Sequence, residues 1–141
     1  MTTQTIKRSR SNVLPIGLGV LNLLLAAGAA WGGILMLRGV GEIFAEFPME
    51  WLGRLPFDSW TPIGCIALFF ALGNALAGVL VLGGKGKPWL LSFLMGALLV
   101  LCVAGQVVVL REWYLAMLEF LAAAVLQMVL SAILAFGKGA S

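Results

Sequence analysis

Four long apolar runs, separated by shorter polar stretches, dominate the pattern of hydrophobic and polar positions. They cover residues 13–37, 61–82, 88–110 and 113–136. About 20 apolar residues are enough for a helix to cross the hydrocarbon core of a bilayer. Lipid offers no hydrogen-bond partner to the backbone, so the spanning segments of an open chain are helical. The pattern therefore predicts an all-α fold, an integral membrane four-helix bundle that forms a single domain over residues 13–141.

The composition is typical of the same class. Of the 141 residues, 62% are hydrophobic and only 11% are charged, whereas a soluble domain carries about 25% charged residues. The net charge of +3 is small, and no basic patch with interleaved aromatic residues is present. We therefore expect the lipid bilayer, and no nucleic acid, as a partner.

Basic residues gather on one side of the predicted bundle. That side holds the basic N-terminus, residues 1–12, together with the turn after the second run and the C-terminal tail, and its basic residues are Lys7, Arg8, Arg10, Lys85, Lys87 and Lys138. The other side holds Arg38, Arg54 and Arg111 and nearly all the acidic residues. The positive-inside rule then places both termini in the cytoplasm. We expect residues 1–12 to be partly disordered.

The connection between the first two runs, residues 39–60, is the longest. It contains two columns with four-residue spacing: apolar Ile43, Phe47, Trp51 and Leu55, and polar Glu42, Glu46, Glu50 and Arg54. This predicts an outer amphipathic segment between helices 1 and 2, which Pro48 divides into two short helical pieces. The segment is either a lid over the bundle or a docking surface, for which Glu42, Glu46, Glu50 and Trp51 are the candidates.

Small residues line one face of each of the first two runs. These stripes contain Asn22, Ala26, Ala29 and Gly33 in the first run, and Ala67, Ala71, Asn74 and Gly78 in the second. Gly28 and Gly32 also form a GxxxG pair. Such stripes let helices approach closely, and we favour packing within one chain over dimerisation.

Five polar residues lie within the apolar runs and form a candidate polar membrane site. At about 1.5 Å per residue, Asn22, Asn74 and Gln127 fall in one layer roughly 20 Å below the outer ends of their helices. Their amides could hydrogen-bond across the bundle as packing contacts, or could line a path for a substrate or ion. Gln106 and Glu119 lie nearer the outer side.

Glu119 is the most distinctive of these residues, because an ionisable group inside a membrane is costly and usually functional. Four roles are open from the sequence. Its side chain could reach outer-side water, be kept neutral by burial, pair with Arg111 or Arg38, or couple protons to transport. Gln106 is its candidate hydrogen-bond partner.

The sequence provides little catalytic chemistry. Histidine is absent, which removes the commonest metal ligand and general base. Cys65 and Cys102 have no CxxC spacing and differ in depth, so a dithiol site is not expected. We therefore expect a protein that is not an enzyme and that needs no metal or cofactor.

Part of the chain resembles an uncharacterised family of small four-span bacterial inner-membrane proteins. The resemblance rests on residues 48–57, on Trp60-Thr-Pro-Ile-Gly64, and on Gly73, Gly32-Gly33 and Gln106. In this chain Ile63 separates Pro62 from Gly64, where the family pattern has adjacent Pro and Gly. The resemblance implies the four-span architecture and a bacterial inner (plasma) membrane location, and it carries over no catalytic residues.

Three functions agree with these features. The first is an accessory or interaction subunit of a membrane complex, which fits the small size and the missing catalytic groups. The second is a small proton-coupled transporter or channel that acts as a homo-oligomer, with Glu119 as its carboxylate. The third is a protein that binds a lipid or another hydrophobic ligand beneath the outer segment. The partner is then a membrane protein, a second copy of this chain, or a lipid.

Overall fold

A computed structural model describes residues 2–38, 49–56, 58–113 and 115–137. The elements are α1 (Thr2–Leu37), the 3-10 helix η2 (Met49–Arg54), α2 (Thr61–Gly83), α3 (Pro88–Leu110) and α4 (Leu115–Gly137). The described fold is all-α, as the sequence predicts, and its four α-helices are each long and apolar enough to span a membrane. The membrane-length part of α1 is Asn12–Leu37, so α1 also includes the polar N-terminal residues from Thr2 onwards.

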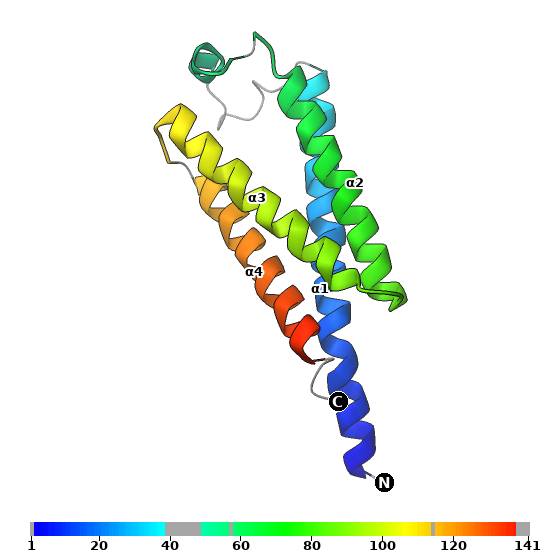
Figure 1. The fold of residues 1–141 in the computed structure, drawn as a ribbon. Helices are drawn as coiled ribbons and strands as arrows, with labels where there is room; N and C mark the ends of the chain where they lie inside the picture. The colour runs from blue at the N-terminus through cyan, green and yellow to red at the C-terminus, as the bar shows by residue number, and fades with distance from the viewer. Residues whose placement is uncertain (1, 39–48, 57, 114, 138–141) are drawn as a thin grey trace.

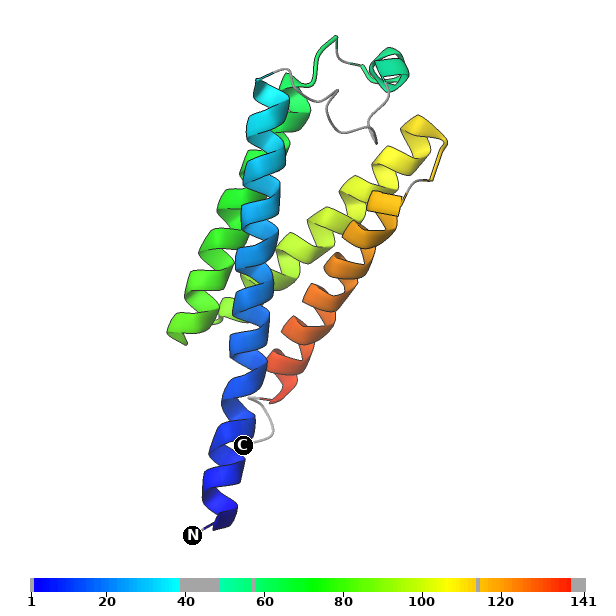
Figure 2. The ribbon, with the colours of Figure 1, turned by 180° about the vertical axis from the view of Figure 1, so that it is seen from behind.

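The four helices form two closely packed pairs, α1 with α2 and α3 with α4. The pairs lie close together at the end where the α2–α3 turn joins them, and they diverge toward the end that carries η2 (Figures 1 and 2). We call these the turn end and the η2 end. The start of α1 and the end of α4 both lie toward the turn end (Figure 1). This V-shaped arrangement decides which polar residues can meet.

Glycine allows the close approach of α1 and α2. A Cβ atom added to Gly33 would lie 3.0 Å from the carbonyl oxygen of Gly64, and one added to Gly64 would lie 3.0 Å from the carbonyl oxygen of Gly33. Further along the same contact, a Cβ on Gly78 would lie 3.1 Å from the carbonyl oxygen of Gly19. Gly33 and Gly78 of the two predicted stripes thus take part in close packing within one chain, against Gly64 and Gly19, which the stripes did not include. The GxxxG pair of Gly28 and Gly32 takes no part, because a Cβ on either would meet nothing within 4 Å.

The helix ends follow the turn chemistry of the sequence. α2 ends at a left-handed Gly84, with φ 64°, whose N–H donates to the carbonyl oxygens of Leu80 and Val81. Pro88 then opens α3, where its missing N–H has no cost. α3 ends at Arg111, which is also left-handed, with φ 55°. Because a non-glycine residue disfavours this conformation by about 1–2 kcal/mol, the sharp connection to α4 must be held by other contacts.

η2 begins directly after Pro48, where the second short helical piece was expected. It is a six-residue 3-10 helix. Half of the predicted amphipathic segment, including Glu42 and Glu46, lies outside the described residues.

Candidate functional site

The polar residues of the four helices form two separate groups, one at each end of the V. Toward the turn end, each helix contributes one polar side chain: Asn22 of α1, Asn74 of α2, Ser92 of α3 and Gln127 of α4. All four side chains are buried, with at most 2% of their surface exposed. Toward the η2 end, Gln106 and Glu119 line a cavity. The sequence placed the three amides in one layer, and the structure brings these three together.

Hydrogen bonds join the buried group into one network across both helix pairs. The Gln127 Nε2 group donates to Asn22 Oδ1 at 2.7 Å and to Asn74 Oδ1 at 2.8 Å. Asn22 Nδ2 donates to Ser92 Oγ at 2.9 Å. Gln127 thus connects α4 to α1 and α2, and Ser92 connects α3 to α1. We call these four side chains the amide network.

Backbone carbonyls fix the orientation of the amides. Asn22 Nδ2 donates to the Leu18 carbonyl at 2.7 Å, and Asn74 Nδ2 donates to the Phe70 carbonyl at 2.9 Å. Since a carbonyl can only accept, both Oδ1 atoms must face the Gln127 NH2 group. The Gln127 Oε1 atom is then turned away, and it has no hydrogen-bond partner among the described residues. Gln127 Oε1 is therefore the one buried atom of the amide network that has no hydrogen-bond partner among the described residues.

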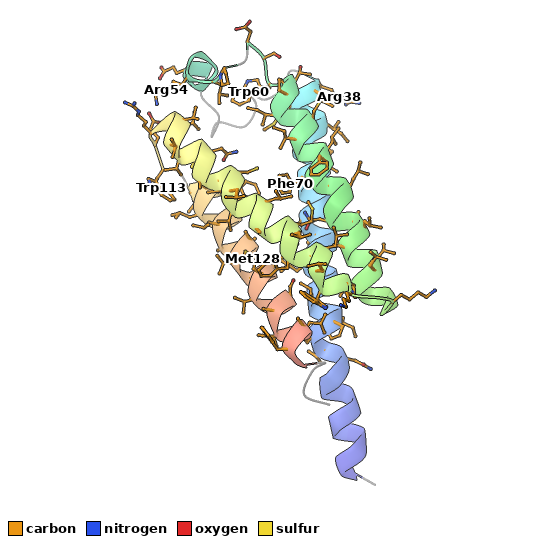
Figure 3. The ribbon with its side chains drawn as sticks, viewed as in Figure 1. Arg38, Arg54, Trp60, Phe70, Trp113 and Met128 are labelled. Carbon is orange, nitrogen blue, oxygen red and sulfur yellow. The ribbon has the colours of Figure 1, made fainter. Side chains whose placement is uncertain are left out.

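The second group lies in a cavity of about 390 Å³ between the diverging helix pairs. α1 and α2 supply one wall, and α3 and α4 supply the other. The lining is mostly apolar and aromatic, and its large side chains include Trp31, Met36, Trp60, Phe70, Leu99 and Phe120. Phe70 also accepts the hydrogen bond from Asn74, so the amide network lies directly beyond this part of the wall. Figure 3 shows Phe70 along α2, on the side facing α3.

Glu119 is exposed and lines this cavity, together with the half-buried Gln106. Among the described residues Glu119 makes no hydrogen bond or ion pair, so the pairing with Arg111 or Arg38 considered from the sequence is not formed. Neither is a hydrogen bond to Gln106 present. Glu119 is thus an acidic group that lines an apolar cavity without a counter-charge among the described residues.

Trp60 and Leu55 line the cavity at the η2 end. Trp60 is 8% exposed and packs with Val103, Leu110 and Met117 of the α3–α4 pair. It precedes α2 directly, so its ring reaches from one helix pair to the other (Figure 3). Leu55 packs against the same cluster. We call Leu55 and Trp60 the roof.

An arginine fastens η2 over the end of α3. The Arg54 Nη1 atom donates to the Leu110 carbonyl at 2.8 Å and to Glu112 Oε1 at 2.6 Å. The last carbonyls of a helix lack partners within the helix and favour a positive charge. Both side chains are nearly half exposed, so this contact is a surface latch. It also lies directly beside Arg111, whose left-handed backbone turns the chain toward α4.

The predicted docking surface is described only in part. Glu50 is exposed on η2, and Trp51 lies in the same 3-10 helix. Glu42 and Glu46 lie outside the described residues, so the docking surface stays a prediction.

Sequence reasoning missed the role of Ser92 and the Arg54–Glu112 contact. Ser92 lies near the turn end of its run, about 27 Å from the outer end by the same count, so depth alone did not place it in the layer of the amides. From the sequence, Arg54 was placed in the polar column of residues 39–60, with Glu42, Glu46 and Glu50. Its real partner, Glu112, is 58 positions away, and no local spacing points to it.

In the described part of the chain, no three His, Cys, Asp or Glu side chains lie close enough together to hold a metal ion. Cys65 and Cys102 are both free thiols, and only Cys102 lines the cavity. Comparison with models of protein families, with curated proteins and with solved structures found no match. The resemblance to a bacterial four-span family therefore stays a prediction.

Proposed function

We propose that this chain is a multi-pass membrane protein that binds a hydrophobic or amphipathic molecule in the cavity between its helix pairs. The observation that carries the proposal is the cavity itself, which combines an apolar lining with one carboxylate and one amide. Ligand sites in proteins have volumes of about 300–1,000 Å³ and combine apolar walls with a few polar groups. The 390 Å³ cavity agrees with both properties.

The amide network beside the cavity supports binding of a ligand in the pocket over its passage through the bundle. Beyond its deep wall, the amide network joins all four helices with buried hydrogen bonds. A through path would have to separate these contacts. We therefore propose a binding pocket that is closed toward the turn end and entered from the membrane or from the η2 end. In a bacterial inner membrane, with both termini cytoplasmic, that entrance faces outward.

The other two functions remain predictions with weaker support. An accessory subunit relies on the acidic docking surface, half of whose residues lie outside the described part of the chain. A proton-coupled transporter requires Glu119 and the three amides to act together, yet they belong to two separate groups. The binding proposal involves only residues that line the same cavity.

A pair of glycine substitutions on α1 tests the proposal. Gly32 lines the cavity, and a side chain there would extend into open space. Gly32→Phe should therefore fill the cavity without displacing the backbone. Gly17→Phe is the matched control, since Gly17 is exposed on the same helix, has nothing within 4 Å of an added Cβ, and does not line the cavity.

The measurement is native mass spectrometry of protein extracted gently from its own membranes, followed by identification of the retained small molecules. We expect a hydrophobic molecule bound to the wild type and to Gly17→Phe, and its loss from Gly32→Phe. Equal retention by both variants, or no retention by any of the three proteins, would refute the pocket. A stoichiometric protein partner in place of a small molecule would favour the accessory-subunit function.

A further inference from the structure

We propose that the ligand of this cavity is a lipophilic cation, an apolar molecule that carries one positive charge. This inference rests on the proposed binding function and specifies its chemistry. It follows from the charge of the cavity wall, from the aromatic side chains in it, and from the other contacts of the nearby arginine.

The charge of the wall has one sign. Among the described residues that line the cavity, Glu119 is the acidic one, and none is Lys or Arg. In a medium of low dielectric constant, an uncompensated charge is costly, and an opposite charge brought close to it is strongly attracted. A cationic ligand would supply the counter-charge that the described protein residues do not provide. An anionic ligand would be repelled by the same carboxylate.

Aromatic side chains reinforce this preference. The cavity is lined by two indole and two phenyl rings, those of Trp31, Trp60, Phe70 and Phe120. The face of an aromatic ring attracts a cation, most strongly in the case of Trp, by about 0.5–2 kcal/mol depending on desolvation. Phe120 follows Glu119 directly on α4, and Trp60 belongs to the roof. The rings also provide the apolar contact area that a lipophilic ligand requires.

The arginine nearest to the roof has its own partners. The Nη1 atom of Arg54 is hydrogen-bonded to the Leu110 carbonyl and to Glu112. Arg54 does not line the cavity, although Leu55, the next residue, does. The latch therefore holds a positive charge outside the pocket, and Glu119 remains the group that meets the ligand.

Two ions of nearly the same size and shape provide the test. Tetraphenylphosphonium is a lipophilic cation, and tetraphenylborate is the matching anion. The protein is placed in nanodiscs of neutral lipid, and equilibrium dialysis measures binding of each ion in excess of empty nanodiscs. We expect wild-type protein to favour the cation by roughly tenfold, from the carboxylate and the rings together. Glu119→Gln should lose most of that preference, whereas Glu50→Gln, a change at an exposed acid outside the cavity, should keep it.

The outcomes separate the inference from the function on which it rests. Binding of both ions with equal strength, or stronger binding of the anion, overturns the cation inference and leaves the pocket in place. A cation preference that survives Glu119→Gln also overturns it, because the charge would then be sensed elsewhere. If neither ion binds and Gly32→Phe retains as much hydrophobic material as wild type, both proposals fail.

Discussion

The polar side chains at the two ends of the V have opposite environments. At the turn end, four neutral side chains from four helices are buried and hydrogen-bonded to one another. At the η2 end, a carboxylate faces an apolar cavity without a partner among the described residues. Neutral amides that satisfy each other can hold helices together at little cost, whereas an isolated carboxylate adds no such stability and marks a functional site. The structural role and the proposed binding role therefore lie at different ends.

The same contrast appears between two adjacent glycines of α1. Gly33 faces α2, where an added Cβ would lie in a tight contact 3.0 Å from the Gly64 carbonyl oxygen, while Gly32 lines the cavity and has nothing within 4 Å of an added Cβ. One residue of rotation on a helix, about 100°, moves a side chain from a tight interface to an open wall. The α1–α2 interface and the cavity wall can thus be probed with matched substitutions of one residue type.

The largest effect is expected from the amide network. Gln127→Leu removes the Nε2 donor and leaves the Asn74 Oδ1 atom without its donor in a buried place. We expect a loss of about 2 kcal/mol in the free energy of unfolding, since an unsatisfied buried group costs about 1–3 kcal/mol. The same change at the half-buried Gln106, Gln106→Leu, should shift it by less than about 0.5 kcal/mol. Reversible unfolding in bicelles measures both.

Equal losses from the two glutamine variants would break the comparison, because they would show that the η2 end depends on its amide as much as the turn end does. A small loss from both would mean that packing, and not the network, joins the helix pairs.

A smaller effect is expected at the paired glycines. Gly33→Ala places a Cβ 3.0 Å from the Gly64 carbonyl oxygen, and backbone cannot move aside cheaply. Overpacking of this kind costs about 1–3 kcal/mol, and the gain in helix propensity offsets up to about 1 kcal/mol of it. We expect Gly33→Ala to be about 1 kcal/mol less stable than wild type in the same unfolding assay. Gly32→Ala should be neutral or slightly stabilising, and a loss there equal to that of Gly33→Ala would contradict the open wall.

Much of the fold could be predicted because lipid leaves few choices. The four apolar runs predicted α2, α3, α4 and the end of α1 to within a few residues, whereas α1 begins at Thr2, eleven residues before the first run. Helix depth alone grouped Asn22, Asn74 and Gln127. Depth is a local property, since it needs only a count from the end of each run. Close packing of α1 and α2 through small residues was also predicted, although Gly33 and Gly78 of the stripes pack against Gly64 and Gly19, which lie outside them.

The cavity could not be predicted, because it depends on how far the two helix pairs diverge. No residue count distinguishes a compact bundle from a V, and the grouping of Glu119 with aromatic residues of α1 and α2 follows only from the V. For the same reason the sequence could not decide whether Gly28 and Gly32 pack against a helix or face open space. The Arg54–Glu112 latch is a contact between distant segments and leaves no periodic signal.

The smallest effect on the free energy of unfolding is expected for the Arg54–Glu112 latch at the η2 end. Arg54→Gln removes an exposed ion pair, which contributes less than about 1 kcal/mol. Its consequence should instead be access to the cavity, because η2 and the roof residue Leu55 lose their anchor on α3. Cys102 lines the cavity and reports that access. In a Cys65→Ser background, we expect a water-soluble thiol reagent to modify Cys102 several times faster when Arg54 is replaced.

Arg38→Gln is the matched control for this labelling experiment, because it removes the same charge from an exposed position at the end of α1. High salt should accelerate labelling of the otherwise unchanged background protein and have little effect on Arg54→Gln, since ions screen an exposed pair. If Arg54→Gln and Arg38→Gln label at the same rate, the latch does not control entry, and the ligand must enter between the helix pairs from the lipid. If only Arg54→Gln is faster, entry is controlled at the η2 end, and the roof acts as the gate of the binding site.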